Sequence, residues 1–335
     1  MRRSPQTSAT LLTLALSTLL GACTSSAPKD TAPKDTAPQD TAAPAKPEAP
    51  AQPSVAPRSA TPGGDSCGDP LIPGSGNTGY DVQSYALDLR YTGPDQPIEA
   101  TARIRAKATQ DLSRFNLDFS GLEVRSARVD GATALFERQG QELVIWPAQP
   151  LALEREFEVE IAYGGVPVGV EDSTLPVPGV VIGWQTAEDE VYVFSQPNGA
   201  MNFLPCNDHP SDKALYSARL TVPKPLMAVS NGVLRETLDS GDARTFVWSA
   251  RDPMATYLIT IAIGEFEVEE LVAADGRKYL NYYSPKLRAN QRKSFAKTPQ
   301  IVETLESITG AYPFEACGNI ASSLRLPAAL ETQTI

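Results

Sequence analysis

Between residues 80 and 163 the chain alternates apolar and polar residues with a period of two. The longest such run is 98–108, in which isoleucine and alanine alternate with glutamate, threonine, arginine and lysine. Because successive side chains of a strand point to opposite faces, this run predicts a strand with one buried and one solvated face. Residues 85–91, 115–119 and 157–163 repeat the pattern, with Gly, Pro and Asp between the runs. These runs predict a mainly β protein built on antiparallel sheet.

The β pattern continues in the second half of the chain. Short apolar runs predict strands over 191–195, 218–222, 246–248 and 256–263. The stretch 164–190 is rich in Pro, Gly and acidic residues, and it is predicted to be irregular.

After residue 283 the period changes to that of a helix, predicted over 288–308. Thr298 is the expected N-cap, Pro299 suits the first helical position, and Gly310 is placed to end the helix in a left-handed conformation. The predicted apolar stripe consists of three residues at helical spacing: Ile301, Leu305 and Ile308.

Turn-forming residues crowd the segment 196–216, which we call the central loop. Its Asn-Gly, Asn-Asp, His-Pro and Ser-Asp pairs favour turns, and the apolar residues Phe203, Leu204 and Cys206 are expected to pin it onto a core. A loop held so firmly between strands is predicted to be functional.

The first 23 residues have the pattern of an export signal. Two arginines precede an apolar run over 9–20, which is too short to span a bilayer, and small residues then precede Cys23. The tetrad 20–23, Leu-Gly-Ala-Cys, resembles the bacterial lipobox, which implies a lipoprotein signal peptide over 1–22 and a lipid on Cys23. An ordinary cleaved signal is the alternative. The resemblance further implies an outer-membrane or cell-surface location.

A Pro/Ala/Thr-rich segment follows, predicted to be a disordered linker over 23–78. Its near-repeats of Ala-Pro followed by Lys-Asp or Gln-Asp cannot bury a core, so it is expected to act as a spacer, with a partner-docking tract as the alternative.

Composition narrows the classes of partner. The 335 residues are 41% hydrophobic and 21% charged, enough for one large or two ordinary domains, and the net charge of −11 argues against nucleic acid as a partner. Besides Cys23 there are three cysteines. Cys206 is predicted to be a buried free thiol, whereas pairing of Cys67 with Cys317 stays open.

Several segments together resemble the aminopeptidase N-like family of zinc metallopeptidases. In that family a Gln is followed about ten residues later by a W-F-P-C-x-D-x-P run, and here Gln196 is followed by F-L-P-C-N-D-H-P over 203–210. The run 254–266, the Tyr-Pro-Phe over 312–314 and the end segment 328–333 also resemble family segments. The resemblance implies a saddle-like antiparallel β domain over 79–268, followed over 269–335 by the incomplete start of an α+β thermolysin-like catalytic domain.

The segment 328–333, Ala-Ala-Leu-Glu-Thr-Gln, resembles the family's exopeptidase motif, with Ala328 in place of the usual Gly. The resemblance implies that Glu331 binds the free α-amino group of a peptide substrate, with Ala329 and Gln196 as further substrate-binding residues. A partly desolvated carboxylate suits this role because it forms charge-assisted hydrogen bonds to an ammonium group.

The family's zinc chemistry requires an H-E-x-x-H helix, which the 335 residues do not contain. His209 is the chain's single histidine and is expected to form hydrogen bonds within its loop. Zinc is therefore expected for the complete family enzyme, with no catalytic residue and no metal ligand in this chain.

Two functions follow from these observations. The first is the front part of a surface-anchored zinc aminopeptidase, inactive alone, whose complete form removes N-terminal residues from peptides. The alternative is a non-catalytic truncated lipoprotein with a binding or vestigial β domain.

Overall fold

The computed structural model describes residues 59–171, 179–187, 189–324 and 329–335. The predicted signal peptide, Cys23 and most of the predicted linker lie outside the described residues, as does Ala328. The described part is mostly strand, which confirms the mainly β fold class. No helix within these ranges is long and apolar enough to cross a membrane.

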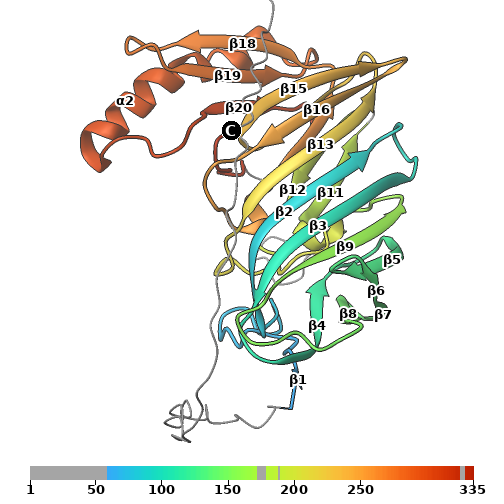
Figure 1. The fold of residues 1–335 in the computed structure, drawn as a ribbon. Helices are drawn as coiled ribbons and strands as arrows, with labels where there is room; N and C mark the ends of the chain where they lie inside the picture. The colour runs from blue at the N-terminus through green and yellow to red at the C-terminus, as the bar shows by residue number, and fades with distance from the viewer. Residues whose placement is uncertain (1–58, 172–178, 188, 325–328) are drawn as a thin grey trace, which may run out of the picture. The chain divides into compact units, whose positions relative to one another are not determined.

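An eight-stranded sheet forms the framework, and its long strands lie side by side in Figure 1. Its order is β15-β16-β13-β2-β3-β9-β5-β6. The strands are β2 (Tyr80–Arg90), β3 (Ile98–Ala108), β5 (Glu123–Val129), β6 (Ala132–Thr133), β9 (Glu156–Gly165), β13 (Leu215–Pro223), β15 (Val233–Ser240) and β16 (Ala243–Ser249). The predicted strand 98–108 and β3 have the same ends, because alternation is strongest there.

One pair of strands in this sheet departs from the predicted antiparallel arrangement. β13 pairs with β2 in parallel, from Leu215 opposite Ser84 to Thr221 opposite Arg90. A period of two reports which face of a strand is buried and carries no information about the direction of its neighbour.

A four-stranded sheet has the order β1-β4-β8-β7. The strands are β1 (Thr61–Pro62), β4 (Leu112–Asp118), β7 (Leu135–Gln139) and β8 (Glu142–Trp146). Residues 59–78, which the sequence assigned to the linker, contact this sheet. Gly63 N–H donates to the carbonyl oxygen of Arg114 at 2.9 Å, and the Asn77 amide donates to the Asp118 carboxylate at 3.1 Å. The packed region therefore begins before residue 79, because these residues find hydrogen-bond partners that composition does not reveal.

A five-stranded sheet has the order β10-β11-β12-β17-β14. The strands are β10 (Val170–Glu171), β11 (Val181–Ala187), β12 (Glu190–Phe194), β14 (Met227–Ser230) and β17 (Ile261–Gly264). The stretch 164–190 was predicted to be irregular, yet it supplies β10 and β11.

The single strand predicted over 256–263 is also wrong. A 3₁₀ turn occupies Thr256–Leu258, and strand begins only at Ile261. The Thr256 hydroxyl donates to the Asp208 carboxylate at 2.6 Å, and Thr260 N–H donates to the Asn231 side chain at 2.7 Å. These tertiary hydrogen bonds redirect an apolar run that would otherwise form one strand.

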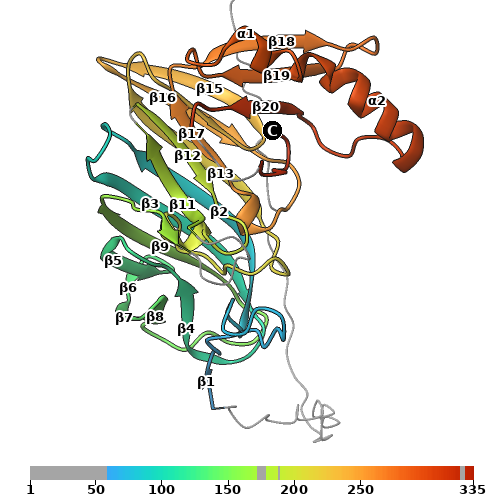
Figure 2. The same cartoon turned by 180° about the vertical axis from the view of Figure 1, so that it is seen from behind.

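One hydrophobic core joins the three larger sheets. Ring contacts cross between them: Tyr91 and Trp184 have centroids 6.3 Å apart, and Phe119 meets Tyr163 edge-on at 4.9 Å. Figure 2, the view from behind, shows β11, β12 and β17 in front of the strands of the eight-stranded sheet.

The end of the chain forms a separate three-stranded sheet with helices beside it. The order is β18-β19-β20, with β19 and β20 parallel. The elements are β18 (Glu267–Val272), β19 (Lys278–Tyr283), α1 (Ala289–Arg292), a 3₁₀ turn (Phe295–Lys297), α2 (Thr298–Thr309) and β20 (Gly318–Ala321).

The predicted helix over 288–308 is thus broken, and its caps differ from the prediction. Lys297 is the N-cap of α2, while the Thr298 hydroxyl donates to the carbonyl oxygen of Phe295 at 2.7 Å. Gly310 has φ 96° and ψ 175°, a positive φ outside the left-handed helical region. The stripe of Ile301, Leu305 and Ile308 is more than half exposed at each residue, whereas Val302 is buried.

Candidate substrate site

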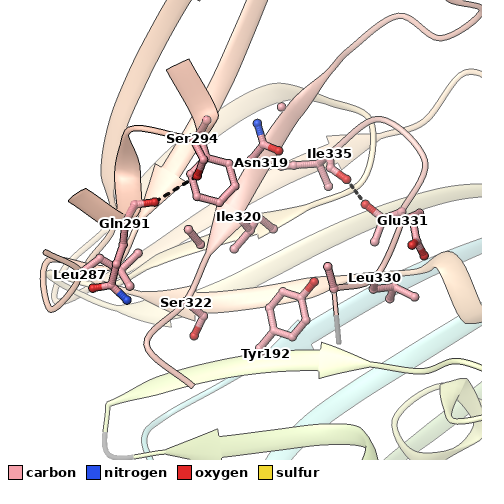
Figure 3. A pocket seen from close by; sticks show the side chains of 15 residues that line it. Tyr192, Leu287, Gln291, Ser294, Asn319, Ile320, Ser322, Leu330, Glu331 and Ile335 are labelled. Atoms are coloured by element: carbon pink, nitrogen blue, oxygen red, sulfur yellow. Dashed lines mark hydrogen bonds between the residues drawn. The ribbon is translucent and has the colours of Figure 1, made fainter. Parts of the chain in front are cut away.

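A pocket of about 580 Å³ lies beside β20 (Figure 3). Its wall is formed by side chains from β12, from α1 and the turn after it, from β20 and from the last residues of the chain. The labelled lining residues are Tyr192, Leu287, Gln291, Ser294, Asn319, Ile320, Ser322, Leu330, Glu331 and Ile335. The lining mixes apolar side chains with hydroxyl, amide and carboxylate groups, which suits a small peptide better than a purely apolar ligand.

Two of the three residues predicted to bind substrate line this pocket. Ala329 and Glu331 are both exposed on its wall. The Glu331 carboxylate makes no hydrogen bond to any described residue, so it is available to a ligand. Gln196 is exposed two residues after the end of β12 and is not among the lining residues. Its role in substrate binding stays a prediction.

Other lining residues were missed by the sequence analysis. Tyr192 is buried, and burial raises the pKa of its hydroxyl to about 12, so it stays protonated at neutral pH. Gln291, Asn319 and Ser322 come from separate elements that meet only in the folded chain. The one available signal is the position of Tyr192, in the predicted strand directly before Gln196.

Glu190, at the start of β12, joins the five-stranded sheet to the pocket wall. Its carboxylate is buried and accepts hydrogen bonds from the hydroxyls of Ser284 and Ser322, the latter at 2.7 Å, and from Ser323 N–H at 2.9 Å. Ser284 follows β19 and Ser322 follows β20, so one carboxylate holds the ends of both strands.

The last residues of the chain are held by the turn between β14 and β15. The Asn231 amide donates to the carbonyl oxygen of Gln333 at 2.9 Å, and Gly232 N–H donates to the Thr334 hydroxyl at 2.6 Å. The Gln333 amide donates to the carbonyl oxygen of Asp252 at 3.1 Å. Gln333 and Thr334 are therefore buried, whereas Glu331, two residues earlier, is exposed.

The central loop is packed onto the core as predicted, with Phe203, Leu204 and Cys206 fully buried. Cys206 carries a free thiol, as predicted, and burial raises its pKa. The thiols of Cys67 and Cys317 are also free.

Buried carboxylates fix the loop. Asp118 accepts the Asp208 N–H at 2.7 Å, while Asp208 accepts Met201 N–H at 3.1 Å. Burial, with the nearby Asp118 charge, raises the pKa of Asp208 to about 7. Burial also raises the pKa values of Asp118 and Glu142. Asp118 and Asp208 hold the loop, and none of the three carboxylates lines the pocket.

The side chains that the structure describes do not form a set of ligands that fits a zinc ion. Among the described residues no group of three or more His, Cys, Asp or Glu side chains could hold a metal. His209 Nδ1 lies 2.7 Å from the Ser211 hydroxyl, and its Nε2 lies 3.4 Å from the Asp69 carboxylate. The histidine thus forms a hydrogen bond within its own loop and directs its other nitrogen to Asp69.

Comparison with known proteins agrees with this architecture. Residues 81–258 match the Peptidase M1 N-terminal domain. The chain belongs to the peptidase M1 family. The match covers the central loop and the strands of the three larger sheets except β1 and β17, and it confirms the family resemblance stated from the sequence.

The chain is also similar to parts of longer curated proteins. The chain is 27% identical over 187 residues to Probable aminopeptidase 1 of Saccharolobus solfataricus, covering 56% of this chain and 22% of that protein. It is 25% identical over 251 residues to the Leukotriene A-4 hydrolase of Xenopus laevis, covering 70% of this chain and 39% of that protein.

Solved structures share the fold. The M1 zinc metallopeptidase from Deinococcus radiodurans superposes with a TM-score of 0.70 at 28% identity, covering 78% of this chain and 60% of that one. A mutant of that enzyme bound to the substrate Tyr-Ser-Ala superposes with a TM-score of 0.71. This M1 chain therefore spans 22% to 60% of the length of these relatives.

Proposed function

We propose that this chain forms the N-terminal β domain and the amino-terminus-binding segment of a zinc aminopeptidase that removes N-terminal residues from peptides. The observation that carries the proposal is the position of Glu331, an exposed carboxylate on the wall of the 580 Å³ pocket with no hydrogen bond to a described residue. Membership of the M1 family and aminopeptidase relatives support it.

The chemistry of the proposed role follows from charge. A peptide α-amino group is protonated near neutral pH, and a carboxylate binds it through charge-assisted hydrogen bonds worth about 1.5–3 kcal/mol. An internal peptide segment has no ammonium group and would leave Glu331 without a partner. Ala329 would then border the bound peptide, and Gln196 would contact the first side chain.

Hydrolysis requires groups that these 335 residues do not supply. We propose that the zinc ligands and the general base lie in further sequence of the complete enzyme, in keeping with relatives that are longer than this chain. The coding sequence downstream of Ile335 tests this directly, and it should encode an H-E-x-x-H segment. Its absence there would favour the non-catalytic alternative.

Binding of a peptide with and without a free amino terminus tests the role of Glu331. We expect the full chain to bind Tyr-Ser-Ala more tightly than N-acetyl-Tyr-Ser-Ala in calorimetric titrations. Glu331→Gln should weaken binding of the free tripeptide by about tenfold to a hundredfold, because the charge-assisted hydrogen bond is lost. The acetylated tripeptide should bind both forms alike.

Glu236→Gln is the matched control, because Glu236 lies exposed on β15 outside the pocket. It should leave both affinities unchanged. Equal affinity of the unmodified chain for the two tripeptides would refute the proposed role.

We further propose that the protein is exported and anchored by lipid on Cys23, at the outer membrane or cell surface. Support comes from the sequence of residues 1–23, with its basic start, short apolar run and Leu-Gly-Ala-Cys tetrad.

A further inference from the structure

We propose that the turn Ser230–Gly232 between β14 and β15, which we call the anchor turn, positions Glu331 for recognition of the peptide amino terminus. Asn231 and Thr334 are then positioning residues, and the proposal rests on the substrate role of Glu331 given above. It assigns to the β domain a part in the selection of substrates.

The anchor turn is rigid in itself. Asn231 is fully buried, and its side chain accepts the Thr260 N–H at 2.7 Å and donates to the carbonyl oxygen of Leu258 at 3.0 Å. Gly232 has φ 88°, and a Cβ atom there would lie 2.2 Å from the carbonyl oxygen of Ser249. Glycine is therefore required, and the turn is pressed against the end of β16.

The anchor turn holds the residues directly after Glu331. The second donor bond of Asn231 goes to the carbonyl oxygen of Gln333, and Gly232 N–H donates to the Thr334 hydroxyl. Two residues of chain span at most about 7 Å, so fixing Gln333 restricts where the Glu331 carboxylate can lie.

The backbone conformation of Thr334 is a second, independent indication that the residues after Glu331 are held in place. Its φ is 76°, in the left-handed region that β-branched residues rarely adopt, and the residue is only 2% exposed. Such a backbone conformation is strained and persists only where the surroundings enforce it. The hydrogen bond from Gly232 to the Thr334 hydroxyl is one contact that enforces it.

Substitutions at Thr334 give the sharpest test. Asn231 is unsuitable because it also bonds within the β domain, so its replacement could unfold the chain. Thr334→Val keeps the shape and removes both the acceptor for Gly232 and the hydroxyl that donates to the carbonyl oxygen of Gln333, whereas Thr334→Ser keeps the hydroxyl. Thr245→Val is the matched control, because it removes the 2.8 Å hydroxyl pair of Thr221 and Thr245 on the eight-stranded sheet, outside the pocket.

Two quantities are measured. The first is the affinity for Tyr-Ser-Ala divided by the affinity for N-acetyl-Tyr-Ser-Ala, and the second is the rate of hydrogen exchange of the Gly232 amide. In Thr334→Val we expect the ratio to fall about threefold to tenfold and exchange of that amide to accelerate about tenfold, because the Gly232 amide loses its buried acceptor. Thr334→Ser should restore both, and Thr245→Val should change neither.

The outcomes separate this inference from the proposed function. If the unmodified chain does not distinguish the two tripeptides, the substrate role of Glu331 fails. If it distinguishes them and Thr334→Val does so equally well despite faster exchange at Gly232, Thr334 is merely structural and the positioning role is refuted.

Discussion

At the residue scale, the central loop shows how burial changes the chemistry of a side chain. Asp208 is held by the Thr256 hydroxyl and by Met201 N–H, yet its pKa rises from the usual 3.8 to about 7. The desolvation of a fully buried carboxylate outweighs these two hydrogen bonds. The folded chain consequently binds a proton at Asp208 more tightly than the unfolded chain does.

This difference predicts the pH dependence of stability. Because the pKa of Asp208 is raised in the folded chain, the stabilising contribution of Asp208 to folding is fully present below about pH 4 and is lost as pH rises through about 7. Asp208→Asn removes this titration. Between pH 4 and pH 8 the free energy of unfolding of the variant should therefore rise relative to that of the unmodified chain, by about 4 kcal/mol for a pKa difference of about 3. Urea unfolding at several pH values measures the difference.

The exposed Asp242→Asn is the control for the effect of charge alone. Its difference from the unmodified chain should stay constant over the same range. A constant difference for Asp208→Asn would contradict the raised pKa.

At the scale of elements, α2 has two apolar faces with different surroundings. The predicted stripe of Ile301, Leu305 and Ile308 is exposed, whereas Val302 is buried. Periodicity identifies an apolar stripe, but it does not tell whether another element covers that stripe.

The two faces should respond differently to substitution. Leu305→Gln should change the free energy of unfolding by less than about 0.5 kcal/mol, because the side chain is half exposed and Gln is a good helix former. Val302→Ala should cost about 1–2 kcal/mol by leaving a small cavity. Urea unfolding of the full chain compares them, and a larger loss for Leu305→Gln would show that the exposed face is covered in solution.

At the scale of the whole molecule, the amino-terminal sequence predicts where the protein is held. We expect the mature protein to begin at a lipid-modified Cys23 and to partition into detergent, because an acyl chain adds about 0.8 kcal/mol of membrane affinity per buried CH₂ group. Mass spectrometry of the mature N-terminus checks this.

The Cys23→Ala form should lose the modification and remain in the aqueous phase. Membrane retention of Cys23→Ala, or an unmodified Cys23 in the natural protein, would rule out the lipid anchor.

The sequence by itself determined the family and five strands of the eight-stranded sheet, namely β2, β3, β9, β13 and β16. β3 was predicted with its observed ends, because eleven residues of strict alternation leave only one face to bury. The central loop was recognised because its turn residues and apolar anchors are local features. The candidate site was found only as far as Ala329 and Glu331, which belong to one short motif.

Tertiary structure alone decided what depends on contacts between distant residues. The parallel pairing of β13 with β2, the break in the run 256–263 and the meeting of Tyr192 with Ser322 at one pocket have no local signal. The hydrogen bonds that link Asn231 to Gln333 and Gly232 to Thr334 join residues 102 positions apart. Periodicity reports which side of an element is buried, whereas the partner of each buried polar group is set by the packing of the whole chain.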